Sequence, residues 1–117
     1  MKKMYYLSTC DTCNRILKEL ELPSDFELQD IKKDPLTPEQ LLELKHLSGT
    51  YEALFSKRAR LYKERDLKNK QLSEEDYKNL LLEHYTFLKR PVLVMDQKIF
   101  IGNSKKEVAA AKKALSE

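Results

Sequence analysis

The segment Cys10–Cys13 (CDTC) lies where a short strand passes into a helix, and this junction constrains the fold more than any other stretch. Residues 4–8 are mainly apolar and aromatic, which predicts a buried strand. In the segment that follows, Ile16, Leu17 and Leu20 recur at helical spacing. The free N–H groups and the positive dipole end at a helix start favour a thiolate over a thiol. The pattern therefore predicts a strand-to-helix corner that carries reactive sulfur.

The two cysteines of this segment are the only ones in the chain. Two thiols three residues apart can close a small disulfide ring, and such a pair in a reducing compartment is typical of transient redox chemistry or of half a metal site. A closed zinc site needs four ligands, whereas His46 and His84 stand alone on separate predicted helices. We therefore expect redox chemistry and no metal. The alternative is that Cys10 and Cys13 only pack in the interior.

Length and composition indicate one globular domain over residues 1–117. Hydrophobic residues make up 41% and charged residues 35% of the chain, and no apolar run approaches the roughly 20 residues of a membrane helix. The N-terminus shows no secretory signal, so a cytoplasmic location is expected. A net charge of +3 does not predict direct binding of nucleic acid.

A basic segment at residues 57–70 stands out from this balance. It contains seven basic residues against two acidic ones: Lys57, Arg58, Arg60, Lys63, Arg65, Lys68 and Lys70 against Glu64 and Asp66. A solvated helix and loop would explain these charges, and so would a docking face for an acidic partner.

Helix and strand signals alternate along the chain. Strands are predicted at residues 4–8, 26–31, 91–95 and 99–101, and helices at 13–20, 38–47, 51–55 and after Ser104. Thr37, Pro38 and Gln40 form a strong helix start with a capping box. Ser73 is expected to cap a further helix, whose apolar positions continue through His84 to Leu88.

This order predicts an α/β protein with a thioredoxin-like fold. The first strand, helix and strand form a parallel β-α-β unit, and a hairpin followed by a helix closes the sheet. The helices at about 37–88 then form an insertion between the second and third strands. In that fold the reactive thiol lies at the first strand-to-helix corner, where this chain has Cys10.

The chain resembles the ArsC/Spx family of thioredoxin-like proteins over nearly its whole length. The resemblance rests on CDTC after the first strand and on three further segments: LFSKRARLY (54–62), KRPVLV (89–94) and IGNS (101–104). This family contains glutaredoxin-coupled arsenate reductases and Spx-type regulators that bind RNA polymerase. The resemblance therefore implies thiol redox chemistry.

In the reductases, the first cysteine attacks arsenate and three arginines hold the oxyanion. Arg90 matches one of these arginines, and a second would fall near Ser56, with Arg58 and Arg60 close by. The third would fall near Gly102, where this chain has no arginine. The resemblance thus implies a small oxyanion or a disulfide as substrate. Glutathione, glutaredoxin or thioredoxin is the implied electron donor, and no bound cofactor is expected.

Roles within this family follow for individual residues. Cys10 is the expected nucleophile and Cys13 the resolving thiol, which would attack a mixed disulfide on Cys10. Arg90 would stabilise the thiolate or hold a substrate oxygen, unless it is an ordinary surface arginine. Pro91 resembles the family's proline that faces the thiol, in a bond whose isomer the sequence leaves open. Asp11 opposes a thiolate through its negative charge.

The sequence leaves two alternatives to an enzyme open. A CxxC pair is absent from typical glutaredoxin-coupled reductases and is general in Spx proteins, so a redox-sensing regulator that binds RNA polymerase is the second reading. A family member with an inactive site is the third. In each case we expect a monomer and, for the enzyme, a separate redox partner protein.

Overall fold

The computed structural model describes residues 1–117 as a four-stranded sheet with five α-helices. In chain order the elements, with η for a 3₁₀-helix, are β1 (Lys2–Tyr6), α1 (Asp11–Leu20), β2 (Glu27–Asp30), α2 (Pro38–Ser48), η1 (Glu52–Leu54), α3 (Arg60–Glu64), η2 (Leu67–Asn69), α4 (Glu74–Glu83), η3 (Tyr85–Phe87), β3 (Val92–Met95), β4 (Lys98–Ile101) and α5 (Lys105–Ser116). No helix combines the length and the apolar character needed to cross a membrane.

The chain forms two compact units. The first contains residues 1–34 and 90–117, and the second contains residues 35–89. The helical insertion expected at about 37–88 lies within the second unit. The catalytic residues expected from the sequence, Cys10, Cys13 and Arg90, lie in the first.

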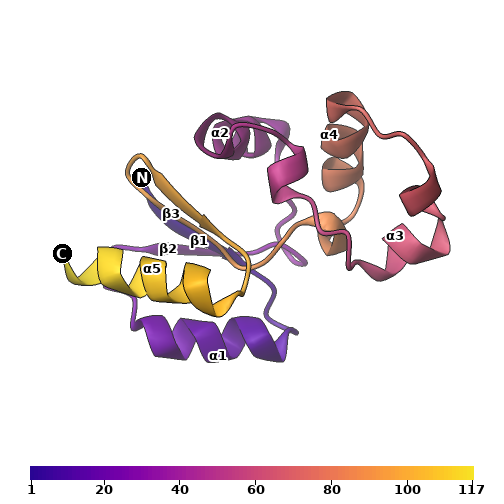
Figure 1. Cartoon of the computed structure of the whole chain (residues 1–117). Helices are drawn as coiled ribbons and strands as arrows, with labels where there is room; N and C mark the ends of the chain where they lie inside the picture. Colours follow the sequence, from indigo (N-terminus) through magenta and orange to yellow (C-terminus); the bar gives the residue numbers. More distant parts are fainter. The chain divides into compact units, whose positions relative to one another are not determined.

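The first unit contains the whole sheet, in the order β2-β1-β3-β4. Strand β1 pairs parallel with β2 and antiparallel with β3, and β3 and β4 form an antiparallel hairpin. Figure 1 shows α1 and α5 together below this sheet. The α/β class, the parallel β-α-β unit and the closing hairpin and helix are confirmed.

The core of this unit joins the two helices to one sheet face. Met4 of β1 and Leu93 of β3 pack with Ile16 of α1 and Ala111 of α5, and each side chain is at most 3% exposed. Because strand side chains alternate between faces, Leu28 of β2 lies on the same face as its partner Met4. Leu28 is nevertheless 51% exposed, because it lies on an edge strand.

The second unit contains α2, α3 and α4 around an aromatic cluster. The ring of Phe55 lies 5.2 Å from Phe87, 4.9 Å from Tyr77 and 5.9 Å from Tyr62, measured between centroids. Offset and edge-to-face contacts of this kind stabilise a core beyond the apolar area that they bury. The capping box predicted for α2 is present.

The boundaries of β1 and α1 differ from the prediction. The strand covers Lys2–Tyr6 rather than residues 4–8, because Ser8 is bound by Asp30 in a turn and leaves the ladder. The helix begins at Asp11, two residues before the predicted start. Cys10 is consequently the N-cap of α1.

The prediction of a helix from Ser73 through His84 to Leu88 was wrong about where the helix ends. Helix α4 ends at Glu83, because His84 is extended (φ −150°, ψ 137°) and its Nδ1 accepts the Thr86 N–H at 3.0 Å. This bond starts η3, so the later apolar residues belong to a 3₁₀ turn and an extended segment. A 3.6-residue pattern therefore persists across a break in the helix.

Leucine-to-alanine substitutions on two strands of the same sheet test where the core lies. Leu93→Ala should lower the free energy of unfolding by about 2–5 kcal/mol, since it opens a cavity where the side chain is 2% exposed. Leu28→Ala, the matched control, should cost less than about 1 kcal/mol. Urea unfolding followed by circular dichroism measures both, and equal losses would contradict this assignment of the core.

Candidate active site

Cys10 lies in the turn between β1 and α1. Its N–H donates to the Leu7 carbonyl at 3.0 Å, and its carbonyl accepts the Asn14 N–H at 3.1 Å, which is the first hydrogen bond of the helix. Its backbone is extended (φ −98°, ψ 115°), as is usual for an N-cap. The side chain is half-buried and forms no regular capping hydrogen bond. The amides of the first turn therefore remain available to a charge on sulfur.

The surroundings of Cys10 favour its anion. Burial alone would raise the pKa of Cys10. The N–H and the thiol of Cys13, the positive charge of Arg90 and the N–H of Thr12 outweigh burial and hold the pKa of Cys10 below its ordinary value. A lowered pKa increases the thiolate fraction at neutral pH, and the thiolate is the nucleophile.

Cys13 has the opposite environment one helical turn further on. Its side chain is fully buried beneath α1. The pKa of Cys13 is raised to about 11, mainly by burial and also by the nearby Cys10 sulfur, although a backbone hydrogen bond at Leu7 and the charge of Arg90 oppose the rise. The pair therefore contains one half-exposed thiol that ionises readily and one buried thiol that stays protonated.

Arg90 and Pro91 precede β3, and the sheet brings them to Cys10. Because β3 pairs antiparallel with β1, the start of β3 lies beside the end of β1, with Val92 opposite Tyr5. The Arg90–Pro91 peptide bond is cis. The Pro91 carbonyl accepts the Gly102 N–H at 2.8 Å, and Gly102 adopts a positive φ of 91° that glycine tolerates best.

Three residues that the sequence analysis did not select hold the turn before Cys10. Both Ser8 N–H and Ser8 Oγ donate to the carboxylate of Asp30, and Asn14 Nδ2 donates to the Ser8 carbonyl at 2.9 Å. Their signal in the sequence is weak. It consists of Ser8 shortly after β1 and Asp30 at the end of β2, two strands that turn out to be parallel neighbours whose carboxyl ends meet at one edge.

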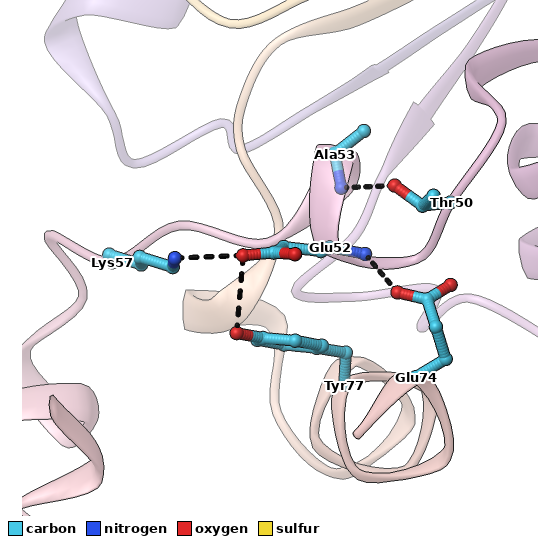
Figure 2. Close-up of polar contacts among 6 residues, drawn as sticks. All are labelled: Thr50, Glu52, Ala53, Lys57, Glu74 and Tyr77. Carbon is cyan, nitrogen blue, oxygen red and sulfur yellow. Dashed lines mark hydrogen bonds and ion pairs between the residues drawn. The ribbon is translucent and has the colours of Figure 1, made fainter. Parts of the chain in front are cut away.

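Arg58 and Arg60, the other predicted substrate-binding residues, lie in the second unit. Both side chains are exposed, and Arg60 Nε lies 3.4 Å from Glu64 Oε1. The residue before them is held more firmly, since Lys57 Nζ donates to Glu52 Oε2 at 2.9 Å (Figure 2). Their part in substrate binding therefore stays a prediction.

The carboxylates around this segment connect its turns. Glu52 Oε2 also accepts a hydrogen bond from Tyr77 Oη at 3.4 Å, and the Glu74 carboxylate accepts the Glu52 N–H (Figure 2). The Glu74 carboxylate accepts the Tyr51 N–H as well. The hydrogen bond and the charge of Lys57 hold the pKa of Glu52 below its ordinary value. These contacts join η1 to α4 and explain part of the basic segment as ion-paired surface.

No group of three or more His, Cys, Asp or Glu side chains is arranged to hold a metal ion.

Comparisons with known proteins place this geometry in context. A family model described as the ArsC family matches residues 5–111. A possible arsenate reductase from Streptococcus mutans is 31% identical, with a TM-score of 0.69, over 90% of this chain and 92% of that one. An arsenate reductase from Vibrio cholerae, 22% identical over 94% of this chain and 96% of that one, has a TM-score of 0.77 and shows a similar fold. The global transcriptional regulator Spx of Bacillus subtilis is 23% identical, over 92% of this chain and 84% of that protein.

Replacing Arg90 tests its electrostatic contribution. Arg90→Gln should raise the pH midpoint of Cys10 alkylation by about half a unit to one unit, because it removes a positive charge that lowers the pKa of Cys10. Arg15→Gln removes the same charge from an exposed position on α1 and should leave the midpoint unchanged. Mass spectrometry of the labelled peptide measures Cys10 alone. An unchanged midpoint in Arg90→Gln would contradict the assigned role.

Proposed function

The chain belongs to the ArsC family, and we propose that it is a thiol-dependent oxidoreductase in which Cys10 is the nucleophile and Cys13 the resolving thiol. The observation that carries this proposal is the contrast between the two sulfur atoms. The helix start and Arg90 favour the anion of the half-exposed Cys10, whereas burial keeps Cys13 protonated. Packing alone does not require such a difference within one helical turn.

With a disulfide as substrate, the proposed reaction has two exchange steps. The Cys10 thiolate attacks one sulfur atom, a mixed disulfide forms, and the other sulfur leaves as a thiolate that takes up a proton. Cys13 then loses its proton and attacks Cys10 Sγ. This forms the Cys10–Cys13 disulfide and releases the second half of the substrate as a thiol. The substrate disulfide is thereby reduced by two electrons and the CxxC pair is oxidised.

The high pKa of Cys13 suits this order of events. The negative charge of Cys10 is one cause that raises it. When Cys10 enters a mixed disulfide it no longer carries that charge, so Cys13 ionises more readily at the stage where it has to attack. Glutathione, or a glutaredoxin or thioredoxin, would supply the electrons that return the pair to its reduced form.

Arsenate is the second substrate class that the family suggests. The Streptococcus mutans protein is described as a possible arsenate reductase. In this proposal Arg90 and the backbone at Pro91 would bind the oxyanion beside Cys10, and a part for Arg58 and Arg60 stays a prediction from the family resemblance. Arg90 Nε is shielded from solvent, which strengthens any charge-assisted bond that its guanidinium makes.

A redox-sensing regulator is the second candidate function. The observation in its favour is the CxxC pair itself, together with the similarity to Spx of Bacillus subtilis. In this case, oxidation to the Cys10–Cys13 disulfide would change the affinity of the protein for RNA polymerase. The exposed charges of residues 57–70 would offer part of the contact surface.

Turnover assays separate these functions. The reduced protein should consume a small disulfide or arsenate in the presence of glutathione and glutaredoxin, and Cys10→Ser should reduce the rate to the uncatalysed level. Cys13→Ser keeps the attacking thiolate and should accumulate the mixed disulfide when glutathione is left out, which mass spectrometry detects. Unchanged turnover in Cys10→Ser would overturn the proposed enzyme.

The regulator is tested with purified RNA polymerase. Binding that differs between the oxidised and the reduced protein, together with no turnover, would favour the regulator over the enzyme. Equal binding in both states would exclude redox control, and no binding would exclude the regulator. A reduced protein with neither activity and an ordinary thiol pKa at Cys10 would indicate an inactive site.

A further inference from the structure

We propose that Asp30 and Asn14 are positioning residues for Cys10 and act through Ser8; this inference rests on the proposed function of Cys10 as nucleophile. We call these three residues the Ser8 clamp. None of them is expected to touch a substrate. Their role would be to keep the Cys10 sulfur in front of the free amides of α1.

The clamp uses every polar group of Ser8. The Ser8 N–H donates to Asp30 Oδ1 at 3.3 Å and its hydroxyl donates to Asp30 Oδ2. The Ser8 carbonyl accepts Asn14 Nδ2 at 2.9 Å. Asp30 Oδ1 also accepts the Lys32 N–H at 3.2 Å, which fixes the carboxylate at the end of β2. Ser8 is therefore held from β2 on one side and from α1 on the other.

These bonds enclose the turn that carries the nucleophile. Ser8 lies two residues before Cys10, and Asn14 lies in the first turn of the helix that Cys10 caps. Inside the turn, the Cys10 N–H donates to the Leu7 carbonyl at 3.0 Å. If the hydrogen bonds of Ser8 to Asp30 and Asn14 were lost, this single bond would have to hold the turn before the helix. The Cys10 sulfur would then spend less time near the N–H groups of Thr12 and Cys13.

The charge of Asp30 distinguishes positioning from a direct electrostatic effect. The hydrogen bond from Ser8 Oγ lowers the pKa of Asp30, so the carboxylate is ionised at neutral pH. A negative charge near Cys10 opposes its thiolate. If charge were its only influence, removing it would make Cys10 more acidic. If Asp30 holds the turn, removing it makes Cys10 less acidic.

The experiment compares four variants of the full chain with the wild type. Asp30→Asn removes the charge and leaves one acceptor oxygen where Ser8 uses two. Ser8→Ala removes one hydrogen bond with no change of charge, and Ser8→Thr keeps the hydroxyl. Asp25→Asn is the matched control, because Asp25 is an exposed carboxylate of the same unit that pairs with Lys2 Nζ at 3.1 Å. The readout is the pH midpoint of Cys10 alkylation, with the melting temperature measured in parallel.

The proposal predicts the direction of each change. In Asp30→Asn the midpoint should rise, with alkylation at neutral pH slower by about threefold to tenfold, as expected for a loss of about half to one pH unit of acidity. Ser8→Ala should shift it in the same direction by less, while Ser8→Thr and Asp25→Asn should match the wild type. A lowered or unchanged midpoint in Asp30→Asn with a native melting temperature would overturn the proposal.

Two further results keep the outcome decisive. If Asp30→Asn does not fold, the comparison of Ser8→Ala with Ser8→Thr decides, and an unchanged midpoint in Ser8→Ala overturns the proposal. Failure of the proposed function has a different signature, because the wild-type midpoint would then lie at about the 8.5 of a free cysteine. The clamp is judged only from the difference between each variant and the wild type.

Discussion

The unsatisfied N–H groups at the start of α1 are the constraint on which the proposed thiol chemistry depends. Every helix begins with amides that have no partner inside the helix, and here the residue placed before them is Cys10. A sulfur anion at this point can accept hydrogen bonds from these N–H groups, and it is also stabilised by the positive end of the helix dipole. Arg90 adds a full charge to the same site.

The sheet makes this arrangement possible by joining distant parts of the sequence. Pairing of β3 with β1 brings the segment at residues 90–91 to the turn that follows β1, and pairing of β2 with β1 brings Asp30 to the same edge. The helix that presents Cys10 is fixed from below, because Ile16 and Leu20 belong to the core. Burial of the same helix face keeps Cys13 away from solvent, so one packing arrangement produces two different thiols.

Much of this could be predicted because it depends on local patterns. The apolar strand, the helical spacing after Cys13 and the capping box at Thr37 are each encoded within a few residues, and they sufficed for the fold class. The end of α4 was not predicted. His84 falls at a position that fits the helical spacing, but its side chain accepts a hydrogen bond that starts the next turn. The contacts of Asp30 were not predicted either, because they depend on which strands pair and in which register. Arg58 and Arg60 lie in the second unit, and their part in substrate binding stays a prediction.

The central claim is that folding lowers the pKa of one sulfur atom in a pair and raises that of the other. Carbon-13 labelling of the cysteine Cβ atoms followed by an NMR titration of the reduced protein observes both directly. The structure predicts a Cys10 inflection below the ordinary pKa of a cysteine, while Cys13 shows its own inflection only near the pKa of about 11. Coincident inflections, or a Cys10 inflection at or above that of a free cysteine, would contradict the claim.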